Sequence, residues 1–161
     1  VTFNSLSKRS NLPGLRSGFA AGNKIQMERF AMIRSYGGAP SPIPVYATAA
    51  AAWSDEKHVE QNRALYREKF ECAKKVFGNH PGFKLPQGGF FLWLDVSTIG
   101  KTGEQATLDL WQKAGIKVLP GAYLARTVNG FNPGDDYIRI ALVHPTDQLE
   151  KSLIHVNQIL S

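Results

Sequence analysis

Apolar residues recur at helical spacing in the second half of the chain, and this pattern predicts three helices. Between residues 58 and 77 they form one stripe, made of Val59, Tyr66, Phe70, Ala73 and Phe77. Residues 104–114 form a second candidate helix, with Leu108 and Trp111 expected to point inward. We expect Thr146 to cap the last helix, whose apolar residues lie three or four positions apart: Leu149, Leu153, Val156 and Leu160.

Shorter apolar runs between these helices predict strands. Residues 90–95 (FFLWLD) are apolar almost throughout, which is typical of a strand buried on both faces. Short strands are also expected at 117–119 and at 137–142 (YIRIAL), where the residues alternate between two faces. Helices covering one side of a small sheet form an α+β layer. The expected core includes Phe70, Phe77, Phe91, Trp93, Trp111, Ile140 and Leu153.

The first part of the chain has a different pattern. Two β-prone runs, at 1–6 and 17–22, precede a helix that Asn23 is expected to cap and that ends near residue 35. Its apolar positions are Ile25, Phe30 and Ile33. A connection rich in Pro and Gly then leads to an alanine-rich helix, with Pro44 in its first turn.

Composition narrows the class of protein. The chain is 43% hydrophobic and 20% charged, as soluble globular domains are. No apolar run reaches the roughly 18 residues of a membrane helix. The single cysteine, Cys72, excludes an intramolecular disulfide and lies in a helical pattern, so we expect a small core residue in a reducing cytoplasm.

The net charge of +6 is concentrated near the start, where residues 1–34 hold six basic side chains against Glu28 alone. A nucleic-acid site would need a basic face with aromatic residues among the charges. An anionic ligand near this segment explains the same charge, because basic patches attract many kinds of anion. We therefore expect neither a nucleic-acid partner nor a membrane.

One cluster of residue types in this segment has a specific chemistry. Ser5 and Ser7 stand three positions and one position before Lys8, and a Pro-Gly turn lies between Lys8 and Arg16. A lysine amine forms a Schiff base with an aldehyde, and the planar fork of arginine matches phosphate oxygens. Because Pro-Gly reverses the chain, Arg16 can return toward Lys8. This combination suits an aldehyde cofactor that carries a phosphate.

The run S-x-S-K followed by P-G-x-R-x-G resembles the lysine motif of fold-type I aminotransferases of class I/II, which depend on pyridoxal phosphate. The wording SLSKRSNLPGLRSGF is most similar to bacterial succinyldiaminopimelate aminotransferases, and the resemblance covers all 161 residues. It implies an α/β to α+β fold in two parts. Residues 1–57 are expected to be a remnant of the large α/β domain, and residues 58–161 the small α+β domain.

The resemblance also implies roles for single residues. Lys8 would be the catalytic lysine that holds pyridoxal 5′-phosphate, with Ser5, Ser7 and Arg16 binding the phosphate, while Arg139 would bind the substrate α-carboxylate. The implied substrates are an amino acid and a 2-oxo acid, with N-succinyl-LL-diaminopimelate and glutamate in lysine biosynthesis as the expected pair. The intact protein would be a cytoplasmic homodimer.

In such proteins well over half of the chain precedes the lysine, so we expect these residues to be a C-terminal fragment. Alone, the fragment is expected to fold, to hold the cofactor poorly, to be inactive and to self-associate. A different class is also open, the effector domain of an aminotransferase-like transcription regulator, as are aspartate, aromatic or kynurenine-type substrates.

Several residues have a simpler alternative interpretation. Arg139 could be an edge-strand charge that blocks aggregation. The Gly88-Gly89 pair could allow close backbone approach or could form a turn into the next strand. Asp135 and Asp136 lie in a Gly-Pro loop and are interpreted as solvated turn residues. The four histidines, His58, His80, His144 and His155, show no spacing typical of metal ligands.

Overall fold

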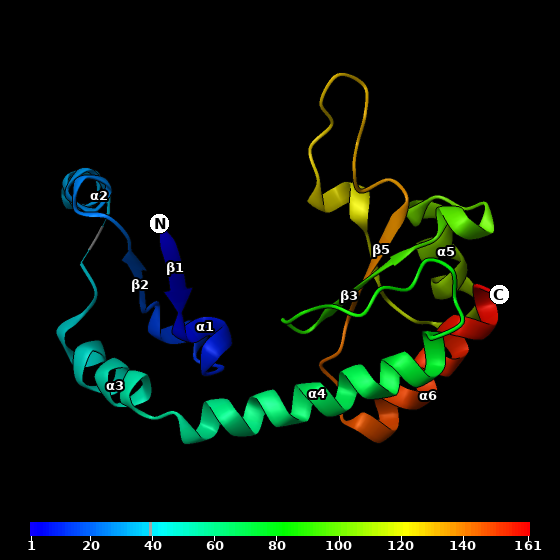
Figure 1. Ribbon diagram of the computed structural model, residues 1–161, viewed down its shortest axis with the longest axis horizontal. Helices are drawn as coiled ribbons and strands as arrows, with labels where there is room; N and C mark the ends of the chain where they lie inside the picture. Colours follow the sequence, from blue (N-terminus) through cyan, green and yellow to red (C-terminus); the bar gives the residue numbers. More distant parts are fainter. Residues whose placement is uncertain (39) are drawn as a thin grey trace. The chain divides into compact units, whose positions relative to one another are not determined.

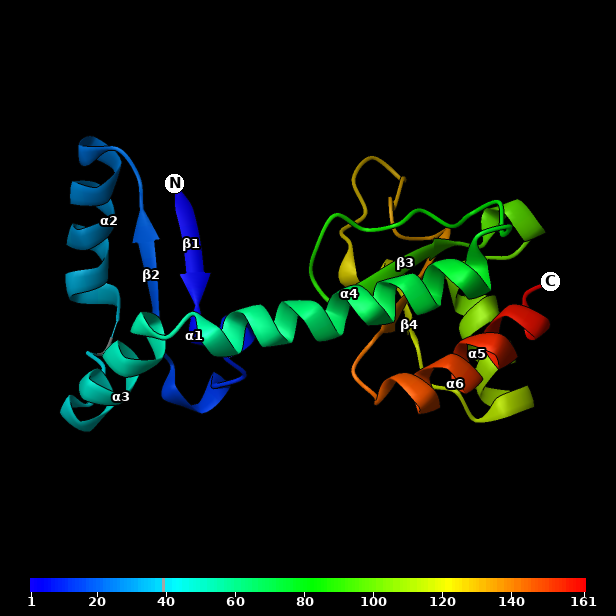
Figure 2. The same ribbon diagram turned by 60° about the horizontal axis from the view of Figure 1, so that its bottom comes forward.

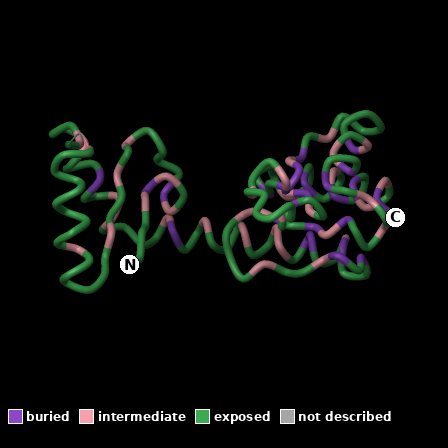
Figure 3. The backbone as a smooth tube through the Cα atoms, turned by 90° about the horizontal axis from the view of Figure 1, so that it is seen from above, coloured by how far each residue is buried: buried purple, intermediate pink, exposed green. Residues whose placement is uncertain are grey.

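A computed structural model describes residues 1–38 and 40–161. These residues form two compact units, Val1–Arg63 and Ala64–Ser161. The division between the two units falls between Arg63 and Ala64, inside one helix, α4, which runs from Lys57 to Phe77 (Figure 1). The predicted long helix over 58–77 is therefore present. Buried positions are concentrated in the second unit (Figure 3).

The first unit contains a two-stranded antiparallel hairpin and three helices besides the start of α4 (Figure 2). Its elements are β1 (Thr2–Ser5), α1 (Leu6–Arg9), the 3₁₀ turn η1 (Pro13–Leu15), β2 (Gly18–Ala21), α2 (Lys24–Gly37) and α3 (Ile43–Ser54). Asn23 caps α2 as predicted, because its side-chain oxygen accepts a hydrogen bond from the N–H of Gln26 at 3.0 Å. Pro44 lies in the first turn of α3, also as predicted.

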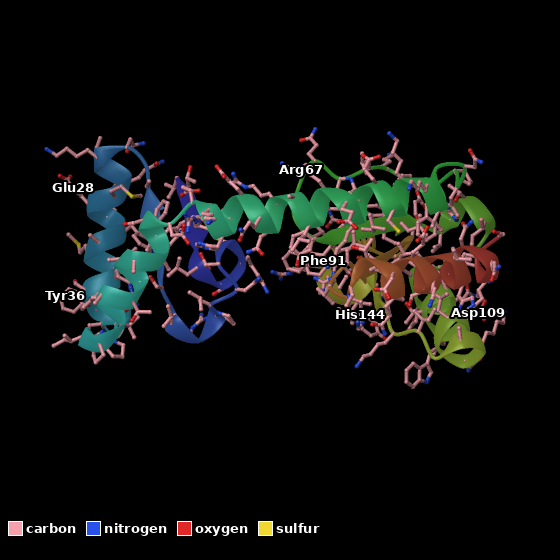
Figure 4. The ribbon with its side chains drawn as sticks, turned by 90° about the horizontal axis from the view of Figure 1, so that it is seen from below. Glu28, Tyr36, Arg67, Phe91, Asp109 and His144 are labelled. Carbon is pink, nitrogen blue, oxygen red and sulfur yellow. The ribbon has the colours of Figure 1, made fainter. Side chains whose placement is uncertain are left out.

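The apolar positions predicted for α2 are exposed rather than buried. Ile25 is 65% exposed and Ile33 72%, while Phe30 is 41% exposed and meets Phe3 edge to face at 5.8 Å. The side chains of Glu28 and Tyr36 likewise point away from the helix (Figure 4). Periodicity predicted the helix correctly but not the burial of its apolar positions in this chain.

The second unit is an α+β layer. Its sheet has three antiparallel strands in the order β3 (Phe91–Asp95), β5 (Tyr137–Ala141) and β4 (Leu119–Pro120). The helices are α5 (Gly103–Ala114), α6 (Thr146–Ile159) and the second part of α4, joined by the short 3₁₀ turns η2 (Ser97–Ile99) and η3 (Gly121–Leu124). The α+β prediction is confirmed.

The core of this unit lies between one face of the sheet and the three helices. Helix residues Ala73, Phe77 and Leu153 pack in one cluster with Leu92 and Ile138 of the sheet. The spaced apolar residues of α6 are all buried as predicted, and so is Cys72. Burial raises the pKa of the Cys72 thiol, as expected for a thiol that acts as a small apolar residue.

Two predictions about this core are wrong. Strand β3 is buried on one face only, because Leu92 and Leu94 are buried while Trp93 is 41% exposed. On α5, Leu108 and Trp111 are 53% and 57% exposed, and Ala106 and Leu110 face the core instead. Both segments are apolar on two faces, so the pattern alone could not identify the inner face.

The ends of two elements also differ from prediction. The cap position of α6 is Pro145, whose carbonyl accepts the N–H of Leu149 at 2.9 Å, and Thr146 is the first helical residue. The strand expected at 117–119 is the two-residue β4, Leu119–Pro120. Among the described residues, no helix is both long enough and apolar enough to cross a membrane.

Candidate functional site

Lys8 lies in a single helical turn that directly follows a strand. Ser5 ends β1 and caps this turn, since its hydroxyl oxygen accepts a hydrogen bond from the N–H of Ser7 at 3.1 Å. Leu6 is fully buried and anchors the turn, whereas Lys8 is exposed. The S-x-S-K sequence thus combines a cap, an anchor and an outward lysine in four residues.

The Pro-Gly segment forms the turn that brings the chain back. Pro13–Leu15 are a 3₁₀ turn, and Arg16 follows in the left-handed conformation with φ of 48°. The Nη1 of Arg16 donates to the carbonyl of Pro13 at 2.9 Å. A residue other than glycine in this conformation costs on the order of 1–3 kcal/mol and is often found at functional sites. The backbone at Arg16 is therefore held by its surroundings.

The hairpin brings the two halves of the motif to one end. Ser5 is opposite Gly18 in the strand register, and the N–H of Leu6 donates to the carbonyl of Ser17 at 3.0 Å. Gly18 has no room for a side chain, because a Cβ there would lie 2.7 Å from the carbonyl oxygen of Asn4. The last glycine of P-G-x-R-x-G is thus required by the close approach of β1 and β2.

A cavity of about 460 Å³ lies beside this end of the hairpin. Arg16 and Ser17 line it together with Arg34 of α2 and Ser41, and α3 completes its wall. Guanidinium and hydroxyl groups are the donors that hold phosphate oxygens in proteins. Lys8, Ser5 and Ser7 do not line this cavity. The donor set therefore fits a phosphorylated aldehyde, with the phosphate donors in the cavity and the amine on the adjoining turn.

Arg139 lies in the second unit, at the centre of its sheet. It is opposite Trp93 of β3 on one side and Leu119 of β4 on the other. Because β5 lies between the other two strands, the alternative that Arg139 is an edge-strand charge is wrong. Its guanidinium carbon lies 4.2 Å from the centre of the Phe91 ring. The guanidinium lies over the face of the ring, and this cation–π contact does not occupy the N–H donors of the arginine.

The face of the sheet that carries Arg139 is the more exposed one. Its aromatic members, Phe91, Trp93 and Tyr137, are half-buried or exposed. A half-buried arginine among aromatic rings is a suitable group for a carboxylate, because the reduced access of water strengthens a charge-assisted pair. The same aromatic residues explain why β3 is apolar on both faces.

Gly88 and Gly89 lie in a bend that leads into β3 and make no close backbone contact with the rest of the described chain. A Cβ at either position would meet nothing within 4 Å among the described residues, and Gly89 has φ of 83°. This positive φ favours glycine at position 89. Asp135 and Asp136 are exposed, in agreement with their interpretation as turn residues. The described part of the chain contains no cluster of His, Cys, Asp and Glu that could hold a metal ion.

Four residues around the lysine turn were not predicted from the sequence. Arg9 donates hydrogen bonds to carbonyls at the end of α3, and Ser10, His58 and Asp55 form a hydrogen-bonded chain. Ser10 and His58 are 48 positions apart, so no local pattern joins them. The only available signal was the Asp55–His58 spacing of three at the start of a helix, which is typical of a capping contact.

Comparison with known proteins supports one family. The family model for aminotransferase class I and II matches residues 1–156. The chain belongs to the class I and II aminotransferase family. Pyridoxal phosphate is the cofactor of this family, and the family relationship agrees with the lysine motif described above.

Individual relatives carry different substrate names. The chain is 32% identical over 151 residues to the 4-dedimethylamino-4-oxo-anhydrotetracycline transaminase OxyQ of Streptomyces rimosus, covering 92% of this chain and 39% of that protein. It is 30% identical over 157 residues to the LL-diaminopimelate aminotransferase of Dehalococcoides mccartyi, covering 95% and 38%. The chain thus spans well under half the length of these relatives.

A solved structure supports the fold. The crystal structure of an aminotransferase from Neisseria meningitidis matches with a TM-score of 0.88 and 43% sequence identity. The match covers 99% of this chain and 40% of that one. The predicted fold class, part of a fold-type I aminotransferase with mixed helix and sheet, is therefore confirmed.

Proposed function

We propose that the whole protein transfers an amino group between an amino acid and a 2-oxo acid, with Lys8 as its catalytic lysine. The observation that carries this proposal is the closure of the motif at one end of the hairpin. The Leu6–Ser17 backbone bond joins the lysine turn to the segment of Arg16, in a chain that matches the family over residues 1–156. We infer that residues 1–57 come from the large domain and residues 58–161 are the small domain.

When bound, pyridoxal phosphate supplies an electron sink for the bonds at the substrate Cα. Lys8 would hold the cofactor through its amine and would move the proton at the substrate Cα. Arg16 would bind the phosphate in the cavity, and we expect the hydroxyls of Ser5 and Ser7 to reach it from the adjoining lysine turn. Arg139 binds the α-carboxylate that every amino-acid substrate has, so it orients substrates without selecting their side chains.

For the substrate, we propose N-succinyl-LL-diaminopimelate with glutamate as donor. The support is the similarity of SLSKRSNLPGLRSGF to succinyldiaminopimelate aminotransferases and the LL-diaminopimelate aminotransferases among the relatives. The transaminase of Streptomyces rimosus is named for a tetracycline precursor, so the family alone does not select a substrate. We also propose a cytoplasmic homodimer, as the resemblance implies.

The roles of the two arginines can be tested separately in the whole protein. Arg16→Ala should weaken retention of the cofactor, and Arg139→Ala should chiefly raise the KM for amino acids. The loss of one partner of a buried charge pair costs about 2–5 kcal/mol, and these sites are partly open, so the lower value is expected. Titrating cofactor and substrate on each variant measures both effects. Equal effects of both variants on both ligands would contradict the assignment.

A substrate panel tests the narrower proposal. Turnover with N-succinyl-LL-diaminopimelate should exceed turnover with unmodified diaminopimelate, aspartate and aromatic amino acids, with 2-oxoglutarate as the common acceptor. Faster turnover of any of these competitors would overturn the proposed substrate and leave the proposed reaction in place.

A further inference from the structure

The turn that carries Lys8 is too short to be stable by itself. It has four residues, Leu6–Arg9, and a single helical turn fixes several dihedral angles for one hydrogen bond. Its first residue, Leu6, is anchored by burial. Its other end, next to Lys8, is held by polar contacts of Arg9 and Ser10. These contacts hold the backbone on the C-terminal side of Lys8.

Arg9 attaches this end of the turn to the last turn of α3. Its Nη1 donates to the carbonyl of Ala52 at 2.8 Å and its Nη2 to the carbonyl of Trp53 at 3.3 Å. Its guanidinium carbon lies 5.1 Å from the centre of the Trp53 ring, and it forms an ion pair with Glu56. The last carbonyls of a helix lack partners within the helix and favour a cation. Arg9 therefore binds α3 through several directed contacts.

Ser10 continues the attachment toward α4. Its side chain is buried, and its Oγ lies 2.8 Å from Nε2 of His58. The Nδ1 of His58 lies 2.7 Å from Oδ2 of Asp55, and Nη1 of Arg9 donates to the Ser10 Oγ at 3.2 Å. The hydrogen bond from His58 lowers the pKa of the Asp55 carboxyl, which favours its ionised form.

The order of donors in this chain follows from the groups at its two ends. Arginine only donates and a carboxylate only accepts. Nδ1 of His58 therefore carries the proton shared with Asp55, and with a neutral imidazole the Ser10 hydroxyl, which already accepts from Arg9, donates to Nε2. Each of the four groups is satisfied when the imidazole is neutral. Such a chain has one preferred geometry, because each bond fixes the direction of the next.

We propose that Arg9, Ser10, His58 and Asp55 are a positioning network that directs Lys8 toward the cofactor. The inference rests on the proposed function of Lys8. A lysine side chain has four rotatable bonds, so its amine reaches a fixed point only when its backbone is fixed. The Ser-His-Asp arrangement resembles that of hydrolases, but Ser10 is buried and accepts a hydrogen bond from Arg9, which suits a structural hydroxyl rather than a nucleophile.

The test measures how fast Lys8 of the whole protein reacts with pyridoxal phosphate. Adduct is trapped by borohydride at several times, and mass spectrometry quantifies the peptides that contain Lys8 and Lys24. Lys24 is an internal reference, since its side chain is 87% exposed and it lies on α2, which contributes no residue to the network. The variants are Ser10→Ala and His58→Gln, with Ser10→Thr as the conservative change.

Asn23→Ala is the matched control. It removes the cap of α2 and so destabilises the same unit without touching the network. We expect Ser10→Ala and His58→Gln to slow trapping at Lys8 by about tenfold or more relative to Lys24, because small misplacements of a reacting group cost large factors in rate. Ser10→Thr should restore the rate, and Asn23→Ala should leave it unchanged.

The outcomes separate this inference from the proposed function. If the unaltered protein shows no preference for Lys8 over Lys24, the proposed role of Lys8 fails and the network has nothing to position. If that preference exists and both variants retain it, the positioning role is overturned while the role of Lys8 stands. If Asn23→Ala slows trapping at Lys8 as much as the network variants do, the slowing reflects lost stability of the unit and the proposal is overturned. Covalent labelling of Ser10 by a fluorophosphonate probe would also overturn it, because it would show that Ser10 is a nucleophile.

Discussion

Two leucines on α5 give a direct test of the core of the second unit. Leu110 is fully buried, and Leu108, two residues earlier on the same helix, is 53% exposed. The two substitutions Leu110→Ala and Leu108→Ala remove the same atoms from the same helix. Their effects on the free energy of unfolding should therefore differ only through burial.

The expected magnitudes follow from the surroundings of each side chain. Truncating a buried leucine removes its transfer free energy and leaves a cavity, at a cost of about 2.7–5 kcal/mol. Fully burying a leucine is worth about 1.5–3 kcal/mol, so the half-exposed Leu108 should lose about 1 kcal/mol, partly offset by the better helix propensity of alanine. The two variants should differ by at least about 2 kcal/mol.

Hydrogen exchange in the 161-residue chain measures this difference locally. The amides of the central strand β5 report on the second unit even if the first unit unfolds separately. A urea transition monitored by fluorescence would mix Trp53 of the first unit with the tryptophans of the second. Equal destabilisation by the two substitutions, or a larger effect at Leu108, would refute the assigned inner face of α5.

Three other substitutions test single features of the structure. Gly18→Ala should destabilise the β1–β2 hairpin by about 1–3 kcal/mol, because the added Cβ meets a carbonyl oxygen. Gly14→Ala is the control and should not destabilise the hairpin, because the space around Gly14 is open. Hydrogen exchange of the Leu6 amide measures both effects, and equal effects would contradict the close approach of β1 and β2 at Gly18. Burial lowers the pKa of His80 below 6.5, so the unfolded chain takes up a proton first and stability should fall as the pH drops below about 6.5. His80→Asn keeps an acceptor for the Gly82 amide and should remove that slope in unfolding measured between pH 5 and 8; an unchanged slope would mean that another group titrates.

The sequence was sufficient to predict most of the elements, because helical spacing, caps and breakers act locally. Asn23 and the α6 stripe behaved as predicted for this reason. Which face of an element is buried depends on what packs against it, so the positions of Trp93, Leu108 and Trp111 were predicted wrongly. Aromatic residues on the Arg139 face gave β3 the pattern of a doubly buried strand.

The candidate site shows the same division. The lysine motif was visible because its residues lie within 14 positions of one another, from Ser5 to Gly18, and the hairpin then joins its halves as the Pro-Gly turn predicts. The contacts of Arg9 and of Ser10 cross more than 40 positions of sequence. Arg139 was suggested only by the resemblance, because its central place in the sheet depends on pairing with β3 and β4.

The proposed function assigns amino-group transfer to Lys8. The most direct measurement follows the ¹⁵N label of an amino acid into a 2-oxo acid, with the whole protein and pyridoxal phosphate present. The unaltered protein and the control Lys24→Ala should transfer the label, and Lys8→Ala should reduce transfer by several orders of magnitude. Transfer by Lys8→Ala at the rate of the unaltered protein would exclude Lys8 as the catalytic lysine.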